Sequence, residues 1–524
     1  MQSDQQIRPQ PSQHSSPQPS QRDQVKQFNR LLCYYGDDFT GSTDVLEALF
    51  QAGLRTVLFL DPPSQELLQE QFQDVECFGV AGIGRSLSPE EMEQELRPIF
   101  TTLKSTGAAI FHYKICSTFD SSPSIGNIGK AAEIGRDVFE GRYIPLLVGV
   151  PYLKRYTLFG QHYAGTSHEI YRLDRHPTMS QHPVTPMAEA DLCKHLEQQT
   201  KLRISTINIL ELDGTPPAVQ ERLAHILQEE HPDVLLFDVL DDQRMEVAGR
   251  MIWEEAKTSD GLFVIGSSGI EYALSACWRS EGMLAAVDKP VDIVAEVEGR
   301  DKGRNKGRNE DEIVSEVKAE VEVGIDDVVF SKTLGEVDQL LVVSGSCSPI
   351  TEGQIKSSLD VGFVGIRVPM DQLLDPKLAE AALLQLRTEV QAQLENGRSV
   401  VVYSASGPSD VSIGLNRDVL MKQGLKAEDS GRLLGMALGK MTKDLIATMG
   451  LHRIVIAGGD TSGYITRELG IYALECLQTI DPGGPLCRAF SHDERFDGLQ
   501  IVLKGGQVGS ERFFEKVRRG DMGQ

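Results

Sequence analysis

Residues 31–50 read LLCYYGDDFTGSTDVLEALF and combine three segments of different character. The first five residues form a short apolar run, which is typical of a buried β-strand. A polar, glycine-containing segment follows at 36–44, and the apolar residues after it have the spacing of a helix. A strand, a Gly/Ser turn and a helix in this order begin a parallel βαβ unit. The repetition of this unit along the chain indicates the architecture.

The same order of segments recurs along the chain. It appears again in the front half at 261–278, which reads GLFVIGSSGIEYALSACW. In the back half, four apolar runs are each followed by a Gly/Ser loop, at 339–349, 399–409, 452–463 and 499–510. We therefore predict an α/β fold with two domains, each a mostly parallel sheet flanked by helices. Because ligands gather at the carboxyl ends of parallel strands, we expect the active site in the cleft between the domains.

Two segments of biased composition mark the limits of these domains. Residues 1–28 consist largely of Gln, Ser and Pro, so we predict a disordered tail that cannot bury enough apolar surface to fold. Residues 286–334 are predicted to be a charged linker or insertion, because 12 acidic and 6 basic side chains lie between positions 290 and 330. The predicted domains are therefore 29–285 and 335–524.

The charge balance limits the class of partner. The 524 residues include 52 basic and 76 acidic side chains, which gives a formal net charge of −24. Nucleic acids and anionic membranes select for fields of Lys and Arg, so we expect neither as a partner. A small anionic ligand needs only a local pocket of donors and is not excluded.

Cysteine use and hydropathy favour a cytoplasmic protein. The eight cysteines are scattered without a C-x-x-C pair, which argues against a disulfide framework and against a zinc site. No apolar run approaches the roughly 18 residues that a membrane helix needs. The N-terminus lacks the apolar segment of a secretion signal. The sequence leaves a homodimer open.

The Gly/Ser loops of the back half are suited to binding phosphate. Glycine lets the backbone approach a ligand closely, hydroxyls donate hydrogen bonds, and the helix that follows presents unpaired N–H groups. The candidate residues are Ser344, Ser346, Gly458, Gly459, Asp460, Thr461, Gly505 and Gly506. The alternative is that these loops only make tight turns and helix caps, as in any α/β protein. The common nucleotide-binding motifs, including G-x-x-x-x-G-K-S/T, are absent.

Two polar segments of the front half are candidates for binding a polyol acid. Asp37 and Asp38 follow a predicted buried strand, where adjacent carboxylates can accept hydroxyls and one can act as a general base. Alternatively, one of them caps the helix and the other is solvated. After a second strand at 108–111, the run that begins at Lys114 offers an ammonium for a carboxylate and hydroxyls for hydroxyls. The alternative here is a Ser-rich surface loop.

Residues 149–187 are a cationic stretch in an acidic chain. Four Lys or Arg and four His side chains lie there against two carboxylates. The histidine spacing does not fit a metal site. A lid that faces an anion, a contact between domains and a contact between subunits are all open. Cys116 is a candidate reactive thiol, although lone intracellular cysteines are more often inert core residues.

Several of these segments together resemble the four-carbon acid sugar kinase family. GDDFTGSTD (36–44) is similar to the signature that opens the N-terminal domain of that family. Four segments of the back half resemble its nucleotide-binding half in order and spacing: SGSCSPIT (344–351), AGGDTSG (457–463), DPGGPLC (481–487) and LKGGQVGSERFF (503–514). The resemblance covers nearly all of 31–520.

The resemblance implies an N-terminal sugar-acid-binding domain, a C-terminal ATP-binding domain and phosphoryl transfer between them. By position, Asp37 and Asp38 would bind substrate hydroxyls, and Arg85 would match the carboxylate-binding arginine of the family. The other implied contacts are, for the substrate, Lys114, Ile115, Cys116, Ser117 and Thr118 and, for ATP, Ser344 or Ser346, Gly458 to Thr461, and Gly505 or Gly506.

The second substrate loop departs from the family pattern K-x-D-S-T-L-R-G-N-x-G. Cys116 stands in the place of the acid, the arginine is missing, and extra residues precede Gly126. The chain therefore resembles a divergent member, for which the fold and ATP use transfer better than the identity of the substrate.

The predicted function is that of an ATP-dependent, Mg²⁺-requiring kinase. Its expected acceptor is a hydroxyl of a small, four-carbon sugar acid such as threonate, erythronate or an oxo-tetronate. Asp37 or Asp38 would orient and deprotonate that hydroxyl, with Asp37 favoured, and Asp460 would lie near the metal or the ribose. No metal-ligand set is predicted. The alternative is a catalytically silent sensor of a sugar acid or nucleotide; an aldolase or dehydrogenase is disfavoured because no dinucleotide fingerprint or Schiff-base context is present.

Overall fold

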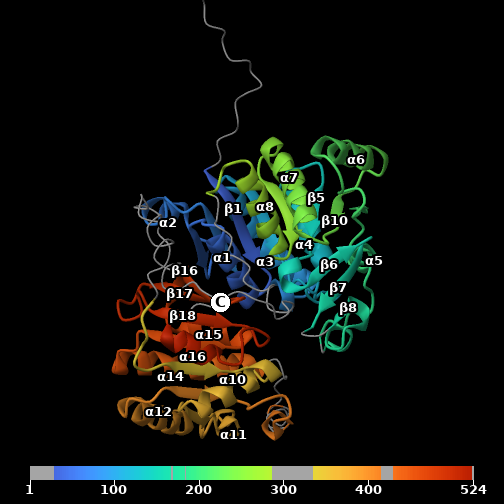
Figure 1. Cartoon of the computed structure of the whole chain (residues 1–524). Helices are drawn as coiled ribbons and strands as arrows, with labels where there is room; N and C mark the ends of the chain where they lie inside the picture. The colour runs from blue at the N-terminus through green and yellow to red at the C-terminus, as the bar shows by residue number, and fades with distance from the viewer. Residues whose placement is uncertain are drawn as a thin grey trace, which may run out of the picture.

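The computed structural model describes residues 29–166, 169–182, 184–285, 334–414, 420 and 429–521. The predicted tail at 1–28 lies outside the described residues, as does all but the last residue of the predicted linker. The described chain forms one 15-stranded sheet and a separate three-stranded sheet, with helices packed around them (Figure 1). No helix of this described part is long and apolar enough to cross a bilayer.

The N-terminal half contributes eight parallel strands to the large sheet, in the order β2-β3-β1-β4-β11-β5-β10-β9. Most of these strands are buried along their whole length, as expected of a parallel sheet covered by helices on both faces. The strands are β1 (Arg30–Gly36), β2 (Thr56–Phe59), β3 (Cys77–Ala81), β4 (Ala108–Lys114), β5 (Ile144–Leu147), β9 (Ile204–Ile207), β10 (Val234–Phe237) and β11 (Leu262–Gly266). The helices are α1 (Phe39–Gln51), α2 (Gln65–Glu70), α3 (Pro89–Lys104), α4 (Ile128–Val138), α5 (Leu192–Glu197), α6 (Pro216–Glu229), α7 (Asp242–Thr258) and α8 (Gly269–Ser280).

The C-terminal half contributes five parallel strands, in the order β13-β14-β12-β15-β18, and an antiparallel hairpin. The parallel strands are β12 (Leu341–Ser344), β13 (Val364–Arg367), β14 (Val400–Tyr403), β15 (Arg453–Ala457) and β18 (Gln500–Lys504). The hairpin consists of β16 (Ile471–Asp481) and β17 (Gly484–Ser491). The helices are α10 (Pro349–Asp360), α11 (Met370–Leu373), α12 (Ala379–Glu395), α14 (Asp429–Met449), α15 (Gly459–Glu468) and α16 (Phe513–Arg519). The predicted α/β architecture is confirmed.

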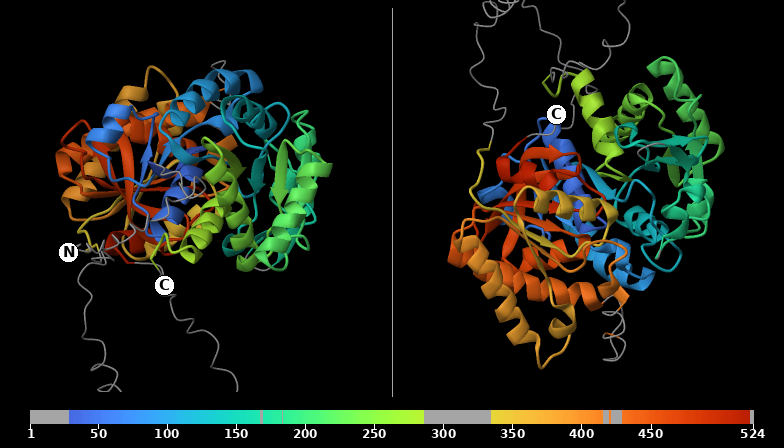
Figure 2. Two further views of the ribbon diagram at one scale, coloured as in Figure 1. Left: turned by 90° about the horizontal axis from the view of Figure 1, so that it is seen from above. Right: turned by 60° about the horizontal axis from the view of Figure 1, so that its bottom comes forward.

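The two halves share one continuous sheet, which the sequence does not predict. Strand β16 pairs antiparallel with β2, so that Leu474 lies opposite Leu58. In both views of Figure 2 the red C-terminal strands accordingly lie beside the blue N-terminal segments. An ion pair between Arg55 Nε and Glu475 Oε1, 2.9 Å apart, borders this seam. One hydrophobic cluster also contains buried side chains of both halves, so the relative position of the two halves is fixed by packing as well as by hydrogen bonds.

Two segments that the sequence suggests as loops are largely helical. Helix α1 begins at Phe39 because the side chain of Asp38 accepts a hydrogen bond from the Gly41 N–H (3.1 Å) and thus caps the first turn. Helix α15 begins at Gly459, directly after Gly458. A φ of +127° at Gly458 turns the chain from β15 into this helix, and side chains rarely tolerate that conformation. Polar residues predicted in loops are therefore held in rigid first turns.

The seam between the halves yields a stability prediction. Phe72 is fully buried and packs edge-on against Phe59 and Phe490, one from each half, with ring centroids 5.2 Å apart in each case. Replacing Phe72 by Ala should lower the free energy of unfolding by about 3–5 kcal/mol, measured by denaturant unfolding. The matched control is Phe159→Ala, whose ring is 59% exposed and whose loss should change stability little. Equal effects of the two substitutions would contradict a packed seam.

Candidate functional site

The strand order of the front half brings three predicted substrate segments together. Strands β3, β1 and β4 are neighbours and parallel, so the residues after their carboxyl ends meet at one edge of the sheet. The backbone N–H of Asp37 donates to the Lys114 carbonyl (2.8 Å), and the N–H of Arg85 donates to the Asp37 carbonyl (2.8 Å). These two bonds fix the first carboxylate between the other two segments.

Arg85 binds both carboxylates of the predicted pair. Its Nη2 donates to Asp37 Oδ1 (2.7 Å) and to Asp38 Oδ1 (2.9 Å), and its Nε donates to Asp37 Oδ2 (3.2 Å). We expected this guanidinium to face a substrate carboxylate. Its observed contacts hold the two aspartates in a fixed orientation, and its role toward a substrate carboxylate stays a prediction.

The two aspartates differ in pKa although they are adjacent. Burial raises the pKa of Asp37 to about 6, and the charge of Arg85 only partly offsets this effect. Burial acts on Asp38 as well, but Arg85 and Lys114 outweigh it and lower the pKa of Asp38. Asp38 caps helix α1, as the alternative interpretation of the pair expected. Asp37 is 3% exposed and is therefore not solvated, contrary to that interpretation. Asp37 is thus the carboxylate suited to exchange a proton near neutral pH.

Lys114 is buried beside the same acids. Its Nζ lies 3.5 Å from Asp44 Oδ2. Burial alone would lower the pKa of Lys114, but Asp44 and the aspartate pair raise it above its ordinary value. The ammonium is therefore charged and compensated from within the site, which combines three carboxylates with two cations.

The segment after Lys114 is packed inside the protein and is not a surface loop. Ile115 and Thr118 are buried, and Cys116 and Ser117 are half-buried. The thiol of Cys116 contacts Thr118 Oγ1 (2.9 Å), which in turn donates to Asp120 Oδ1 (2.8 Å). Burial raises the pKa of Cys116 to about 11, so the group is a neutral thiol at physiological pH and is poorly suited to act as a nucleophile.

The cationic stretch at 149–187 contacts this segment through a histidine. It contains the three-stranded antiparallel sheet β6 (Arg155–Leu158), β7 (Gln161–Gly165) and β8 (Ile170–Arg172). His162 is buried, and its Nε2 lies 2.8 Å from the Ser117 carbonyl oxygen. Burial lowers the pKa of His162 to about 4, so it is neutral and structural. The contact is therefore with the substrate loop of the same half; His168 lies outside the described residues.

The predicted phosphate loops also lie side by side. Strands β12, β15 and β18 are neighbours, so the segments at 344–348, 458–461 and 505–506 share one edge of the sheet. The hydroxyl of Ser346 contacts Thr351 Oγ1 (3.1 Å), and a methyl group on Gly506 would lie 2.9 Å from Ser346 Oγ. The glycines there permit a close approach of loop to loop that another residue would block.

The two halves of the site meet at Thr40. Its hydroxyl donates to Asp38 Oδ2 (2.9 Å). A methyl group placed on Gly505 would lie 3.6 Å from the same hydroxyl oxygen, and one on Gly459 would lie 4.0 Å from it. The predicted substrate carboxylates are thus directly adjacent to the predicted phosphate loops. Asp460 lies in the first turn of α15, but its side chain is outside the described part of the structure.

Three residues of this region were not among the predicted site residues: Thr40, Asp44 and Lys504. Thr40 and Asp44 lie inside the GDDFTGSTD motif. The directions of their side chains depend on where helix α1 begins, and the cap at Asp38 sets that start. Lys504 is the last residue of the largely apolar strand β18. A lysine at the carboxyl end of such a strand is the sequence feature from which a binding role could be predicted.

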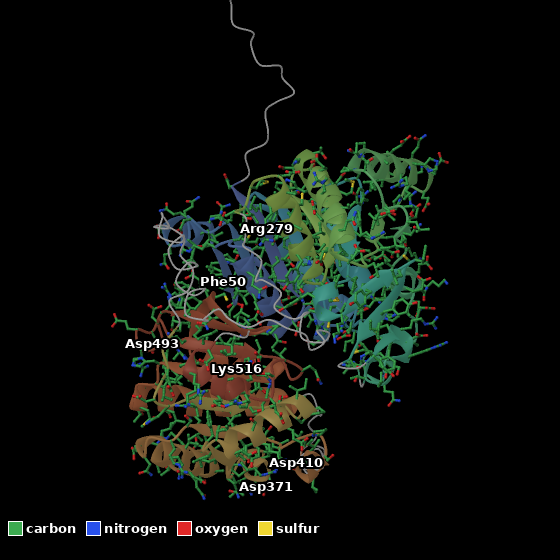
Figure 3. The ribbon with its side chains drawn as sticks, viewed as in Figure 1. Phe50, Arg279, Asp371, Asp410, Asp493 and Lys516 are labelled. Carbon is green, nitrogen blue, oxygen red and sulfur yellow. The ribbon has the colours of Figure 1, made fainter. Side chains whose placement is uncertain are left out.

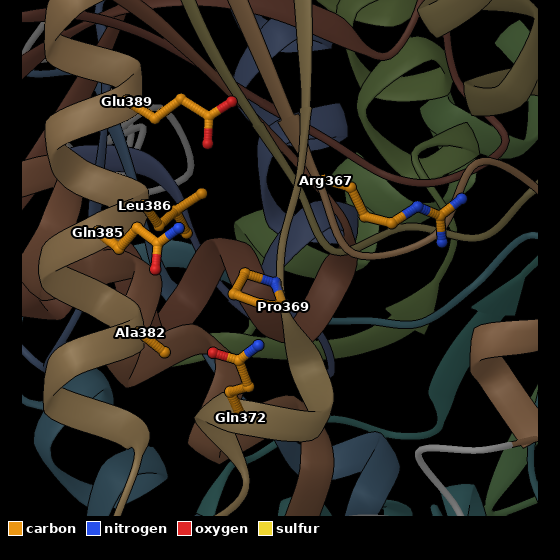
Figure 4. Close-up of a pocket in the computed structure, with 7 residues that line it drawn as sticks. All are labelled: Arg367, Pro369, Gln372, Ala382, Gln385, Leu386 and Glu389. Atoms are coloured by element: carbon orange, nitrogen blue, oxygen red, sulfur yellow. The ribbon is translucent and has the colours of Figure 1, made fainter.

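A small pocket elsewhere in the C-terminal half is not part of this region. It encloses about 120 Å³ between the end of β13 and helix α12, and Figure 4 shows Arg367, Gln372 and Glu389 at its wall. The Arg367 guanidinium donates to both oxygens of Asp410 (3.0 and 2.8 Å). Its charge is therefore compensated within the protein. Among the described residues, no group of three or more His, Cys, Asp or Glu side chains is arranged to hold a metal ion.

Comparisons with known proteins identify the family of the chain. A family described as a sugar-binding N-terminal domain matches residues 32–274, and a nucleotide-binding C-terminal domain matches residues 341–514. The 3-oxo-isoapionate kinase of Paraburkholderia graminis is 41% identical over 490 residues, which are 94% of each chain. The 3-oxo-tetronate kinase of Pseudomonas savastanoi pv. phaseolicola is 27% identical over 93% of this chain and 96% of its own.

Solved structures share the fold. A Salmonella typhimurium LT2 protein described as a tRNA synthase superposes with a TM-score of 0.68 at 22% identity, covering 93% of this chain and 98% of its own. A Haemophilus influenzae protein superposes with a TM-score of 0.64 at 22% identity, covering 93% and 99%. The names of the curated relatives favour an enzyme over a silent sensor. The chain belongs to the four-carbon acid sugar kinase family and is a kinase with a sugar-binding N-terminal and a nucleotide-binding C-terminal domain.

Proposed function

We propose that the protein transfers the γ-phosphoryl group of ATP to a hydroxyl of a small oxo sugar acid. The first candidate acceptor is 3-oxo-isoapionate, because the relative of that name shares 41% of its residues with this chain, against 27% for a 3-oxo-tetronate kinase. Oxo-tetronates, threonate and erythronate are the next candidates. The observation that carries the proposal is the contact of Thr40 with Asp38 on one side and its proximity to Gly505 on the other.

Phosphoryl transfer depends on positioning and charge neutralisation, and the site offers both. Asp37 would accept the proton of the attacking hydroxyl, and Arg85 would keep its carboxylate in place. Asp38 would bind a second hydroxyl while its oxygens cap α1. Lys114 and the segment Ile115–Thr118 would line the sugar-acid pocket, as the family resemblance implies.

The nucleotide would lie on the three neighbouring loops of the C-terminal half. Ser344 or Ser346, Gly458 to Thr461, and Gly505 or Gly506 are the proposed contacts. Mg²⁺ entering with ATP needs only one or two carboxylates besides the phosphates, and Asp38 can offer one of them. Asp460 stays our candidate for a contact to the metal or the ribose.

A panel assay tests the proposed activity. ADP release would be measured with 3-oxo-isoapionate, 3-oxo-tetronates, threonate and erythronate, each with ATP and Mg²⁺. We expect the highest kcat/KM for 3-oxo-isoapionate and no release without Mg²⁺. Absence of ADP release with every acceptor would overturn the proposal, and a higher kcat/KM for a tetronate would overturn the choice of acceptor.

The raised pKa of Asp37 predicts the pH dependence of catalysis. A general base must be ionised, so kcat/KM should rise with pH up to about 6 and level off above it, falling about tenfold per unit at lower pH. Asp37→Asn should lower kcat by about 10²- to 10⁴-fold while ADP affinity, measured by calorimetry, is retained. The control is Asp371→Asn, an exposed position on α11 at the far end of the C-terminal half (Figure 3). Full turnover of the Asp37 variant would remove Asp37 from the chemistry.

The thiol in the second loop gives a specificity prediction. Cys116→Asp would add a carboxylate beside Thr118 and Asp120, where a like charge is already buried. We expect kcat/KM for the sugar acid to fall by about tenfold or more, with KM for ATP unchanged. Repulsion strong enough to shift a pKa by one unit corresponds to about 1.4 kcal/mol, which is a factor of about ten. Cys116→Ser keeps a small neutral group and should retain activity within about threefold. An unchanged kcat/KM in the Asp variant would place this loop outside the substrate pocket.

A further inference from the structure

Lys504 is a buried cation for which the described residues provide no counter-ion. It is the last residue of β18, its side chain is fully buried, and its Nζ lies 3.2 Å from Thr351 Oγ1. No carboxylate of the described residues forms an ion pair with it, and burial lowers the pKa of Lys504 to about 8. Lys114, equally buried, has Asp44 within 3.5 Å and two further acids nearby. The two lysines end parallel strands in the two halves but differ in compensation.

An uncompensated buried ammonium is costly for the folded protein. Its desolvation costs several kcal/mol, and a single hydroxyl acceptor returns only part of that. The described charged groups on α16 and α10, which pack against this face of β18, have other partners. On α16, Glu515 pairs with Arg512 and Arg519, and Lys516 pairs with Asp481, while on α10 the carboxylate of Glu352 lies against Gly407. The charge of Lys504 therefore remains available for an anion.

A second polar side chain without a partner among the described residues, that of Ser344, lies in register with Lys504 across the sheet. Ser344 of β12 pairs in register with Ala457 of β15, and Ala457 pairs in register with Lys504. Side chains in register across parallel strands point to the same face, so Ser344 and Lys504 flank the small side chain of Ala457. The hydroxyl of Ser344 is fully buried and has no hydrogen-bond partner among the described residues.

The segments around Ser344 and Lys504 present further donors. Ser348 caps α10, a helix of 12 residues, so the positive end of its dipole points at the same edge. The hydroxyls of Ser348 and Thr351 both donate to the Gly506 carbonyl, which holds the 505–506 segment over Lys504. An anion bound on these loops would meet a buried ammonium, an orphan hydroxyl and a helix N-terminus together.

We propose that Lys504 and Ser344 bind the phosphate groups of the nucleotide, so that the ammonium of Lys504 gains its counter-ion only when the nucleotide arrives. This inference rests on the proposed ATP site and assigns to Lys504 a role that the loop motifs alone do not contain. The cost of burying the charge in the free protein is offset by nucleotide binding.

The test compares ADP binding by wild type, Lys504→Met and Lys356→Met. Methionine has a similar length without charge, and Lys356 is an exposed lysine on α10 that serves as the matched control. Calorimetric titration with Mg²⁺–ADP should give about 10- to 100-fold weaker binding for Lys504→Met, the range of a charge-assisted hydrogen bond, and no change for Lys356→Met. Sugar-acid binding should be unchanged in both variants.

Two further readouts separate binding from a structural role. Without nucleotide, the thermal midpoint of Lys504→Met should equal or exceed that of wild type, because an uncompensated buried charge is removed. The affinity of wild type for ADP should fall between pH 7 and 9, as the free ammonium loses its proton near pH 8, whereas the affinity of Lys504→Met should not. Ser344→Ala should weaken ADP binding, but the pH dependence of its ADP affinity should be that of wild type.

The outcomes distinguish the two proposals. If wild type binds no nucleotide, the proposed function is wrong and this inference falls with it. If wild type binds ADP and Lys504→Met binds it equally well, only the role of Lys504 is wrong. A lowered thermal midpoint of Lys504→Met, with the pH dependence of ADP binding retained, would likewise overturn it in favour of a structural role.

Discussion

The antiparallel pairing of β2 with β16 is the constraint on which the rest of the structure depends. It converts two α/β halves into one sheet and fixes the position of Asp37 and Asp38 relative to the Gly/Ser loops of the C-terminal half. Thr40 can lie between Asp38 and Gly505 only because this seam holds α1 against the C-terminal loops. A phosphoryl acceptor and donor must approach within about 3–3.5 Å, so a fixed seam is a direct contribution to positioning.

Charge is distributed unequally between the two sides of the site. On the sugar side, Arg85 and Lys114 are compensated by three aspartates. Burial raises the pKa of Asp37 to about 6, and the charge of Arg85 limits this rise. On the nucleotide side, no described carboxylate pairs with Lys504. A preorganised, self-compensated acceptor site and an uncompensated donor site together suit a reaction in which the nucleotide brings the negative charge.

Much of the fold could be predicted because its signals are local. The apolar run before Asp37 and those before the Gly/Ser loops are buried strands, and residues on neighbouring strand ends do converge. The pairing of β2 with β16 could not be predicted, since residues more than 400 positions apart leave no local pattern. The ion pairs of Arg85 with the aspartates depend on strand order, and the burial of Lys504 depends on which helices cover its strand. Long-range packing decides both.

The continuous sheet also has a consequence for dissecting the protein. If the halves were produced as separate polypeptides, the first would end in the bare edge of β2 and the second in the bare edge of β16, each with unpaired N–H and C=O groups next to apolar side chains. Such edges template association with other strands. In the intact chain each edge covers the other, so reassembly of the enzyme from two chains would require strand addition between β2 and β16.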